Sequence, residues 1–211
     1  MSKDLKFLKR DPNYRQAKKQ GYRARSAYKL FDIQNRYNIF KRAFYILDIG
    51  STPGSWLQVS KKFAQESLEK YNDDYYHRDH FKIMGVDIKK VSPIEDVKIV
   101  KMDATLPEFQ NEIEIFFHDK LDLVLSDASI NKIGNKFSDQ IRQINLCYKI
   151  LDIIKKNLKF KGNCVIKAFQ GQDFNNFFKA MQNEFLIVKS YKPKSSRKSS
   201  NEIYLIGLKK K

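Results

Sequence analysis

Short apolar runs alternate along this chain with longer segments whose apolar residues recur every three or four positions. The short runs have the length and content of buried strands, and they cover residues 44–47, 82–86, 97–101, 121–125, 163–168, 186–191 and 203–208. The longer segments predict helices over residues 14–37, 55–66, 139–158 and 173–183. This alternation predicts an α/β fold, in which helices cover both faces of a mostly parallel sheet of seven strands.

An acidic residue follows each of the first four predicted strands. Asp48 and Asp87 come directly after the first and second strands, and Asp103 and Asp127 come two residues after the third and fourth. The carboxyl ends of parallel strands meet at one edge of a sheet, where ligands bind. We therefore expect these four carboxylates around a single crevice.

The first strand leads into a glycine turn that reads Asp-Ile-Gly-Ser-Thr-Pro-Gly-Ser-Trp from Asp48 to Trp56. Gly50 and Gly54 let the backbone approach a ligand closely, because glycine has no Cβ. The turn differs from the Gly-x-Gly-x-x-Gly fingerprint that receives a pyrophosphate, and a rim of carboxylates would repel that anion. The crevice suits a ligand with ribose hydroxyls, an amine and a positive charge, and S-adenosylmethionine has all three.

A lysine, Lys167, interrupts the apolar run that lies between Gly162 and Gly171. Burying an ammonium group is costly unless the group is paired or gives up its proton. A lysine forced toward its neutral form is a ready general base, so this position suggests chemistry. The alternative is a lysine at a strand end whose amine reaches solvent.

The net charge of +17 is concentrated at the two ends of the chain. Residues 1–30 carry ten lysines and arginines against two aspartates, a net +8, and residues 189–211 carry eight against one glutamate, a net +7. The 158 residues between them carry only +2. Such clustering predicts a nucleic-acid partner. An acidic membrane is disfavoured, because neither end shows the apolar stripe of a membrane-surface helix.

The two cysteines, Cys147 and Cys164, lie in apolar segments without the spacing of metal ligands. They indicate reduced core residues of an intracellular protein. We expect no metal site, and no apolar run reaches membrane-spanning length.

Five segments, in their order and spacing, resemble the FtsJ-like family of RNA ribose 2′-O-methyltransferases over about residues 14–209. These segments are Arg-Ser-Ala-Tyr-Lys-Leu at 25–30, the glycine turn, Ser-Asp at 126–127, the lysine strand at 165–171 and the closing segment at 193–204. The resemblance implies a Rossmann-like, S-adenosylmethionine-dependent methyltransferase fold. It also implies a single domain over residues 1–211, with a basic N-terminal arm and helix over 1–37 and a body with a basic C-terminal tail over 38–211.

The resemblance further implies the residues of the site. The implied catalytic set is Lys29, Asp127, Lys167 and Glu202. The expected cofactor contacts, the turn residues included, come from Asp48, Gly50, Gly54, Trp56, Asp87, Asp103 and Asp127. In this hypothesis Lys167 takes the proton of a ribose 2′-hydroxyl and Asp127 orients the lysine amine, while Lys29 and Glu202 position the ribose.

Two segments depart from the family pattern. The glycine turn has Ser-Thr at 51–52 where the family usually has Ala-Ala, which keeps small residues there. The segment after the fourth strand reads Asp-Ala-Ser-Ile-Asn at 127–131, where the family has Asp-Met-Ala-Pro-Asn. The missing proline bears on the shape of the loop beside the RNA.

Compact family members with basic ends are similar to the enzymes that methylate a uridine of large-subunit ribosomal RNA, which is the expected substrate. The anticodon loop of transfer RNA stays open, because segments 23–27 and 195–200 are similar to that branch too. A non-catalytic RNA-binding module is disfavoured by the filled catalytic positions, and a small-molecule methyltransferase by the basic ends. The sequence indicates no obligate protein partner. The intracellular compartment stays open between the cytoplasm, the nucleolus and an organelle such as the mitochondrion.

Overall fold

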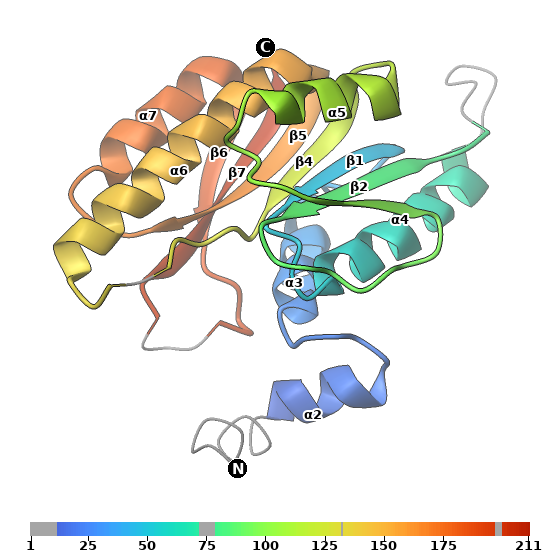
Figure 1. The fold of residues 1–211 in the computed structure, drawn as a ribbon, viewed down its shortest axis with the longest axis horizontal. Helices are drawn as coiled ribbons and strands as arrows, with labels where there is room; N and C mark the ends of the chain where they lie inside the picture. The colour runs from blue at the N-terminus through green and yellow to red at the C-terminus, as the bar shows by residue number, and fades with distance from the viewer. Residues whose placement is uncertain (1–11, 72–78, 132, 197–199) are drawn as a thin grey trace.

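A twisted sheet of seven strands forms the centre of the computed structural model, which describes residues 12–71, 79–131, 133–196 and 200–211 (Figure 1). The strands are β1 (Tyr45–Ile49), β2 (Lys82–Asp87), β3 (Val97–Lys101), β4 (Leu121–Ser126), β5 (Leu158–Phe169), β6 (Phe185–Tyr191) and β7 (Glu202–Lys210). Their order across the sheet is β3-β2-β1-β4-β5-β7-β6. The first five strands run parallel, whereas β7 is antiparallel to both β5 and β6. The strand order reverses between β1 and β4, which is where such sheets form a ligand crevice.

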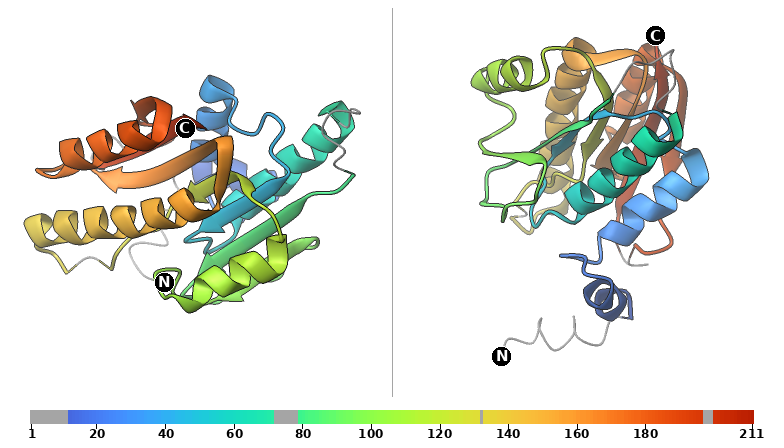
Figure 2. Two further views of the ribbon diagram at one scale, coloured as in Figure 1. Left: turned by 90° about the horizontal axis from the view of Figure 1, so that it is seen from above. Right: turned by 90° about the vertical axis from the view of Figure 1, so that its right-hand side faces the viewer.

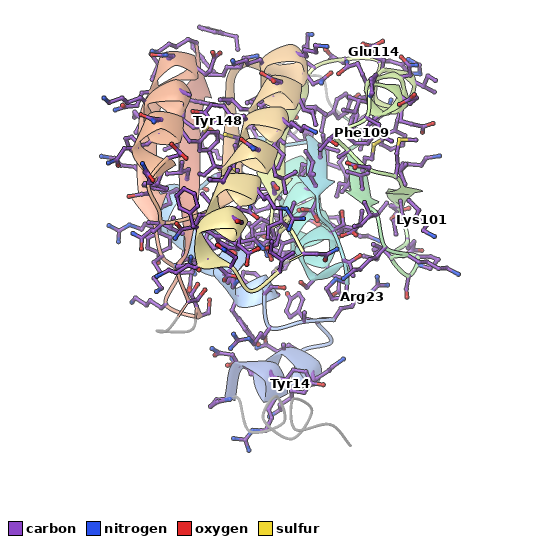
Figure 3. All side chains as sticks on the ribbon, turned by 60° about the vertical axis from the view of Figure 1, so that its left-hand side comes forward. Tyr14, Arg23, Lys101, Phe109, Glu114 and Tyr148 are labelled. Atoms are coloured by element: carbon purple, nitrogen blue, oxygen red, sulfur yellow. The ribbon has the colours of Figure 1, made fainter. Side chains whose placement is uncertain are left out.

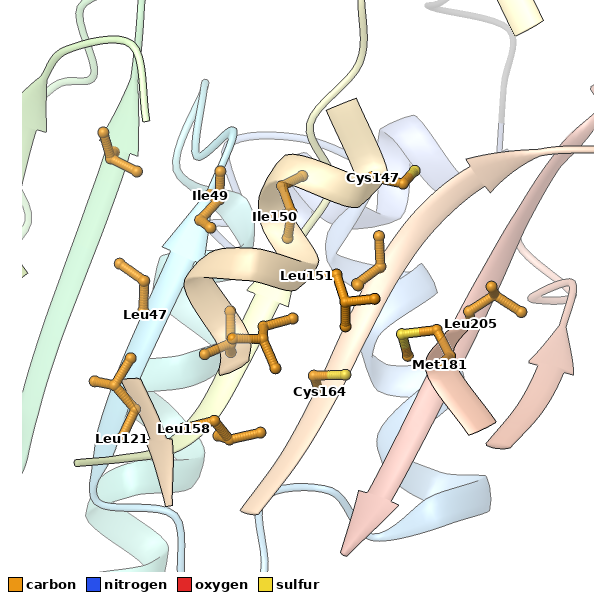
Figure 4. Packing of buried hydrophobic residues seen from close by; sticks show 14 of the residues in the cluster. Leu47, Ile49, Leu121, Cys147, Ile150, Leu151, Leu158, Cys164, Met181 and Leu205 are labelled. Atoms are coloured by element: carbon orange, nitrogen blue, oxygen red, sulfur yellow. The ribbon is translucent and has the colours of Figure 1, made fainter. Parts of the chain in front are cut away.

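Helices cover both faces of the sheet, as the right-hand view of Figure 2 shows. They are α2 (Pro12–Lys19), α3 (Ala27–Tyr37), α4 (Ser55–Tyr71), α5 (Glu108–Phe117), α6 (Lys136–Asn157) and α7 (Phe174–Glu184). Residues of α5, α6 and α7 belong to one buried cluster and residues of α3 and α4 to another. Side chains alternate along a strand, so Leu47 enters the first cluster and Ile46 the second. Figure 4 shows α6 packed on the sheet through Cys147, Ile150 and Leu151.

The seven predicted strands and the mostly parallel sheet are confirmed, with small changes at the ends of elements. The helix predicted over residues 14–37 is two helices, α2 and α3, separated by a turn in which Gly21 has a φ of 79°. Helix α5 was not predicted, although its buried residues Phe109, Ile113 and Phe117 recur every four positions, as the apolar face of a helix does. The part of the basic arm before residue 12 lies outside the described residues.

A buried aspartate at the start of β4 holds the beginning of β1 in place. Asp122 is 4% exposed, and its Oδ2 accepts hydrogen bonds from the backbone N–H groups of Phe44 and Tyr45, at 2.7 Å each. Lys159, from the first residues of β5, forms an ion pair with Oδ1 of the same carboxylate. One side chain therefore aligns the amino ends of three neighbouring strands.

Replacing Asp122 with alanine should lower the free energy of unfolding by about 3 kcal/mol. The N–H groups of Phe44 and Tyr45 and the amine of Lys159 would each lose the contact with this buried carboxylate. Urea denaturation measures this change. Asp152→Ala is the matched control, since the Asp152 side chain is 70% exposed and its pairing with Lys155 is long, at 3.7 Å. We expect it to change stability by less than about 0.5 kcal/mol. Equal effects of the two substitutions would contradict the anchoring role of Asp122.

Candidate active site

A cavity of about 440 Å³ opens at the carboxyl ends of the parallel strands. Its lining includes Gly50 after β1, Asp87 at the end of β2, Asp103 after β3 and Asp127 after β4. This volume suits a small organic ligand. The structure therefore brings three of the four predicted strand-end carboxylates to one cavity.

Backbone hydrogen bonds fix the carboxylates of this rim. Asp87 accepts from the N–H of Thr52 at 2.9 Å and from the N–H of Lys89 at 2.8 Å. Asp103 accepts from the N–H of Thr105 at 2.8 Å. Each carboxylate is thus held by the turn that follows a strand, so its position does not depend on a bound ligand.

The glycine turn is pressed closely against the rest of the site. Gly50 has a φ of 80°, and a Cβ built on it would lie 2.5 Å from Cα of Ala128. Gly54 has a φ of 106° and lies under the guanidinium of Arg23. That guanidinium donates hydrogen bonds to the carbonyl oxygens of Pro53, Ser92 and Pro93, at 3.2, 2.7 and 2.7 Å. A side chain at either glycine would separate the turn from the loop after β4 or from Arg23.

Asp48 differs from the other strand-end acids, because it is fully buried behind the turn. In the part of the chain that the structure describes, neither of its carboxylate oxygens has a hydrogen-bond partner. Burial raises the pKa of this carboxyl well above its usual range, and the neighbouring carboxylates Asp127 and Asp87 raise it further. The raised pKa favours the protonated, neutral form in the absence of a ligand, and a positively charged ligand such as S-adenosylmethionine would favour ionisation.

Trp56 lies behind the described lining of the cavity, as do Asp48 and Gly54. The indole is 2% exposed, its Nε1 donates to the carbonyl of Ser26 at 2.9 Å, and its ring lies 5.8 Å from that of Tyr204. The Trp56 side chain thus joins the glycine turn to the segment that leads into α3. The direct cofactor contact expected of Trp56 stays a prediction.

The four residues of the predicted catalytic set, Lys29, Asp127, Lys167 and Glu202, lie close together as two lysine–carboxylate pairs. Nζ of Lys167 lies 3.1 Å from Oδ1 of Asp127 and donates to the backbone carbonyl of the same residue at 2.5 Å. Nζ of Lys29, on α3, lies 3.0 Å from Oε2 of Glu202, at the start of β7. Both lysines are buried, at 6% and 9% exposure, so the alternative of a solvent-reaching Lys167 does not hold.

A fifth side chain, Tyr204, connects the two lysine–carboxylate pairs. Its hydroxyl donates to Oδ1 of Asp127 at 2.6 Å and accepts from Nζ of Lys29 at 3.1 Å. Tyr204 lies opposite Lys167 in the antiparallel register of β5 and β7, and two residues after Glu202. Tyr204 was not among the site residues predicted from the sequence. Its spacing from Glu202 was the available signal, because residues i and i+2 of a strand share a face.

Two lysine amines face two carboxylates in this cluster, so each carboxylate has a basic partner. Burial opposes ionisation of Asp127, but Lys167 and Lys29 outweigh it and hold the pKa of that carboxyl below its usual value. The same competition, between burial and the two lysines, lowers the pKa of Glu202. Burial, followed by the charge of Asp127, raises the pKa of Tyr204 well above its usual value, so its hydroxyl remains a hydrogen-bond donor. The arrangement presents a buried amine beside a cavity.

The described residues contain no group of three or more histidine, cysteine, aspartate or glutamate side chains that could hold a metal ion. Within the same residues, no helix has both the length and the apolar character needed to cross a membrane.

Asp48→Asn should stabilise the cofactor-free protein, and more so at high pH. The raised pKa means that the folded state keeps a proton which the unfolded chain releases above about pH 4. The stability of the wild-type protein therefore falls as the pH rises from about 4 toward the folded-state pKa of Asp48. Asparagine does not titrate, so the variant does not undergo this fall. We expect the melting temperature of the variant to exceed that of wild type by at least about 3 °C at pH 8 and by less at pH 4.5. Thermal unfolding followed by circular dichroism measures both values, and an equal difference at the two pH values would contradict the assignment.

Known proteins share both the sequence and the fold of this chain. A family model described as FtsJ-like methyltransferase matches residues 22–210. A protein named ribosomal RNA large subunit methyltransferase E from Methanosarcina mazei is 38% identical over 202 residues, which are 95% of this chain and 70% of that protein. A protein of the same name from Methanothermobacter thermautotrophicus is 36% identical, over 94% of this chain and 89% of its own length.

A solved structure from Plasmodium falciparum, described as that of a ribosomal RNA methyltransferase, aligns with a TM-score of 0.74 at 30% identity. The alignment covers 90% of this chain and 98% of that one. The methyltransferase fold predicted from the sequence is thereby confirmed, and S-adenosylmethionine is confirmed as the cofactor. The family model alone spans nearly the whole of the described structure. This chain belongs to the FtsJ-like methyltransferase family.

Proposed function

We propose that this methyltransferase transfers a methyl group to the ribose 2′-hydroxyl of a nucleotide, a uridine in our hypothesis, in large-subunit ribosomal RNA. The observation that carries the proposal is the contact between Lys167 and Asp127, because Asp127 also lines the cavity. A buried amine is thus held at the edge of the pocket that fits the methyl donor. The names of the M. mazei and P. falciparum relatives favour ribosomal RNA as the substrate.

The proposed chemistry uses each member of the cluster differently. A ribose 2′-hydroxyl is a weak nucleophile at neutral pH. In the proposed step Lys167 acts as the neutral amine and takes the hydroxyl proton as the oxygen attacks the methyl carbon. Asp127 holds the lysine amine through both its carboxylate and its backbone carbonyl. Lys29 and Glu202 form the ion pair that positions the sugar, and Tyr204 keeps this pair at a fixed distance from Asp127. When bound, S-adenosylmethionine supplies the methyl group and a positively charged sulfonium.

Asp87, Asp103 and the Gly50 backbone would hold the cofactor from the cavity walls, with the buried carboxyl of Asp48 behind them. The turn and the rim are held by their own hydrogen bonds, so the site is largely pre-formed for this ligand. Much of the acceleration would come from holding the reacting atoms in line, as in other reactions between two bound substrates.

The described basic segments favour a large polyanionic substrate. Helix α2 ends in Lys18 and Lys19 and extends away from the body of the protein (Figure 1). Figure 3 shows Tyr14 of α2 and Arg23 toward one end of the molecule and Glu114 of α5 at the other. The N-terminal segment that supplies Lys29 therefore also supplies positive charge on that side, where phosphate contacts would orient an RNA without reading its sequence.

The substrate is tested by incubating the purified protein with S-adenosylmethionine carrying a labelled methyl group and with separate RNAs. Large ribosomal subunits lacking the modification, small subunits, unmodified transfer RNA and DNA of matched length are the four substrates. We expect label in large-subunit RNA, at a ribose that resists alkaline cleavage of the following phosphodiester. Label in transfer RNA alone would favour the anticodon-loop alternative, and tight RNA binding without label would favour a binding module.

Lys167→Ala should lower kcat at least about 100-fold, because it removes the amine that takes the hydroxyl proton in the proposed mechanism. The affinity for S-adenosylmethionine should stay within about threefold of wild type, since Lys167 does not line the cavity. Lys167→Arg should be equally slow, because a guanidinium does not release its proton at neutral pH.

Methyl transfer at saturating RNA and calorimetric titration of the cofactor measure the two quantities. Lys155→Ala is the control, because Lys155 is 44% exposed near the last turn of α6, away from the cavity. Normal turnover by Lys167→Ala at saturating cofactor would rule out Lys167 as the base.

A further inference from the structure

A glutamine in the middle of the molecule, Gln143 on α6, has no exposed surface and makes three hydrogen bonds to main-chain groups. Its Nε2 donates to the carbonyl oxygens of Ala128 and Lys167, at 3.1 Å each, and its Oε1 accepts from the N–H of Ile130 at 3.1 Å. Carbonyls only accept and an N–H only donates, so this orientation of the amide is the one that satisfies all three groups. Gln143 therefore joins the loop after β4 to strand β5.

The point where Gln143 contacts β5 is Lys167 itself, and this links the glutamine to the proposed chemistry. The Lys167 side chain donates to the backbone carbonyl of Asp127, while its main-chain carbonyl is bound to Gln143, which also binds Ala128. The thiol of Cys147, one helical turn after Gln143, donates to the same Lys167 carbonyl at 3.3 Å. Lys167 is thus attached to the 127–131 loop at two points. Its amine binds the carbonyl of Asp127 directly, and its main-chain carbonyl is linked to Ala128 through Gln143.

The loop that Gln143 holds forms one wall of the cavity. Residues 127–131 all line it, and α6 fixes the loop at two further points. Arg142 donates to the carbonyl of Asn131 at 3.0 Å, and the carboxylate of Asp139 accepts from the N–H of Ile133 at 3.0 Å. Of these three α6 side chains, Gln143 alone contacts Lys167.

Ile130 occupies the position at which the family pattern has a proline. A proline stiffens a loop by restricting its own φ, but it carries no N–H. In this chain the N–H of Ile130 is present and is hydrogen-bonded to the buried Oε1 of Gln143. The restraint that a proline ring would place on the backbone is here replaced by a hydrogen bond from the Ile130 N–H to a glutamine side chain of α6.

We propose that Gln143 is a positioning residue for methyl transfer, which fixes the 127–131 loop through the Ile130 N–H and keeps Lys167 in register with Asp127. This inference rests on the proposed function. Gln143 touches no reacting group and acts through Lys167 and the loop. Its loss therefore changes the placement of the amine rather than removing it.

The test compares Gln143→Met, Ile130→Pro and the double variant with wild type. Methionine fills a similar volume without polar atoms, so it removes all three hydrogen bonds without leaving a large cavity. We expect Gln143→Met to lower kcat at least about tenfold at saturating cofactor and RNA, at a temperature where circular dichroism shows the variant folded. Ile130→Pro should lower kcat about fivefold or more in wild type, because it leaves Oε1 of Gln143 without a partner. In the Gln143→Met background, Ile130→Pro should lower kcat less than twofold or should raise it.

The matched control is Asn157→Leu, which removes another buried amide of α6. Asn157 is 5% exposed and pairs with Gln110 through two hydrogen bonds of 2.9 Å at the far end of the helix. We expect it to lower the melting temperature but to leave kcat within twofold of wild type. A kcat for Gln143→Met within twofold of wild type overturns the inference, as do independent, multiplicative effects of Ile130→Pro and Gln143→Met.

A second measurement separates this inference from the proposed function, because it needs neither RNA nor cofactor. Brief acetylation by acetic anhydride, followed by mass spectrometry, reports the reactivity of the Lys167 amine relative to that of Lys155 in each folded variant. We expect the ratio to change at least threefold in Gln143→Met and to stay unchanged in Asn157→Leu. An unchanged ratio in Gln143→Met overturns the inference. Failure of wild type to methylate any RNA overturns the proposed function, and the labelling ratio still decides the role of Gln143.

Discussion

The carboxylate of Asp127 is the group on which the proposed site depends. It lines the cavity on one side and contacts Lys167 and Tyr204 on the other. A carboxylate in this position is costly to bury, and the two nearby lysines are what keep it charged. Conversely, the lysines are stable in a buried place because carboxylates face them. Removing one member of such a set leaves an uncompensated charge, so the members must be present together.

Strand pairing late in the chain completes this set. The antiparallel register of β5 and β7 places Tyr204 opposite Lys167 and Glu202 opposite Phe169. Helix α3 then brings Lys29 to Glu202 across a separation of 173 residues. A methyltransferase site at the switch point between β1 and β4 thus depends on both ends of the chain. The described parts of the two basic terminal segments meet there, because Lys29 and Glu202 form an ion pair.

The loop after β4 and the glycine turn both line one pocket, and each is held from outside it. Arg23 joins the glycine turn to the carbonyl oxygens of Ser92 and Pro93, and Gln143 joins the loop to strand β5. Neither Arg23 nor Gln143 belongs to the lining of the cavity. This arrangement gives a rigid site without drawing on the residues that perform the chemistry.

The sequence by itself determined the strands, the parallel order of the sheet and the acidic ends of β1 to β4, because each depends on local patterning and on a general rule for such sheets. It also indicated Lys167, since a lysine inside an apolar strand is conspicuous without knowledge of its neighbours. Only the tertiary structure revealed the partners of Tyr204, Trp56 and Gln143, which are distant in the sequence: the Tyr204 hydroxyl donates to Asp127 across 77 residues and the Trp56 indole donates to Ser26 across 30. Helix α5 is short, and its apolar face becomes clear only in the fold, where Phe109, Ile113 and Phe117 join the buried cluster on one face of the sheet. A polar side chain whose partner is distant in the sequence produces no periodic pattern. For this reason the hydrogen bonds that support the site became visible only in the folded structure.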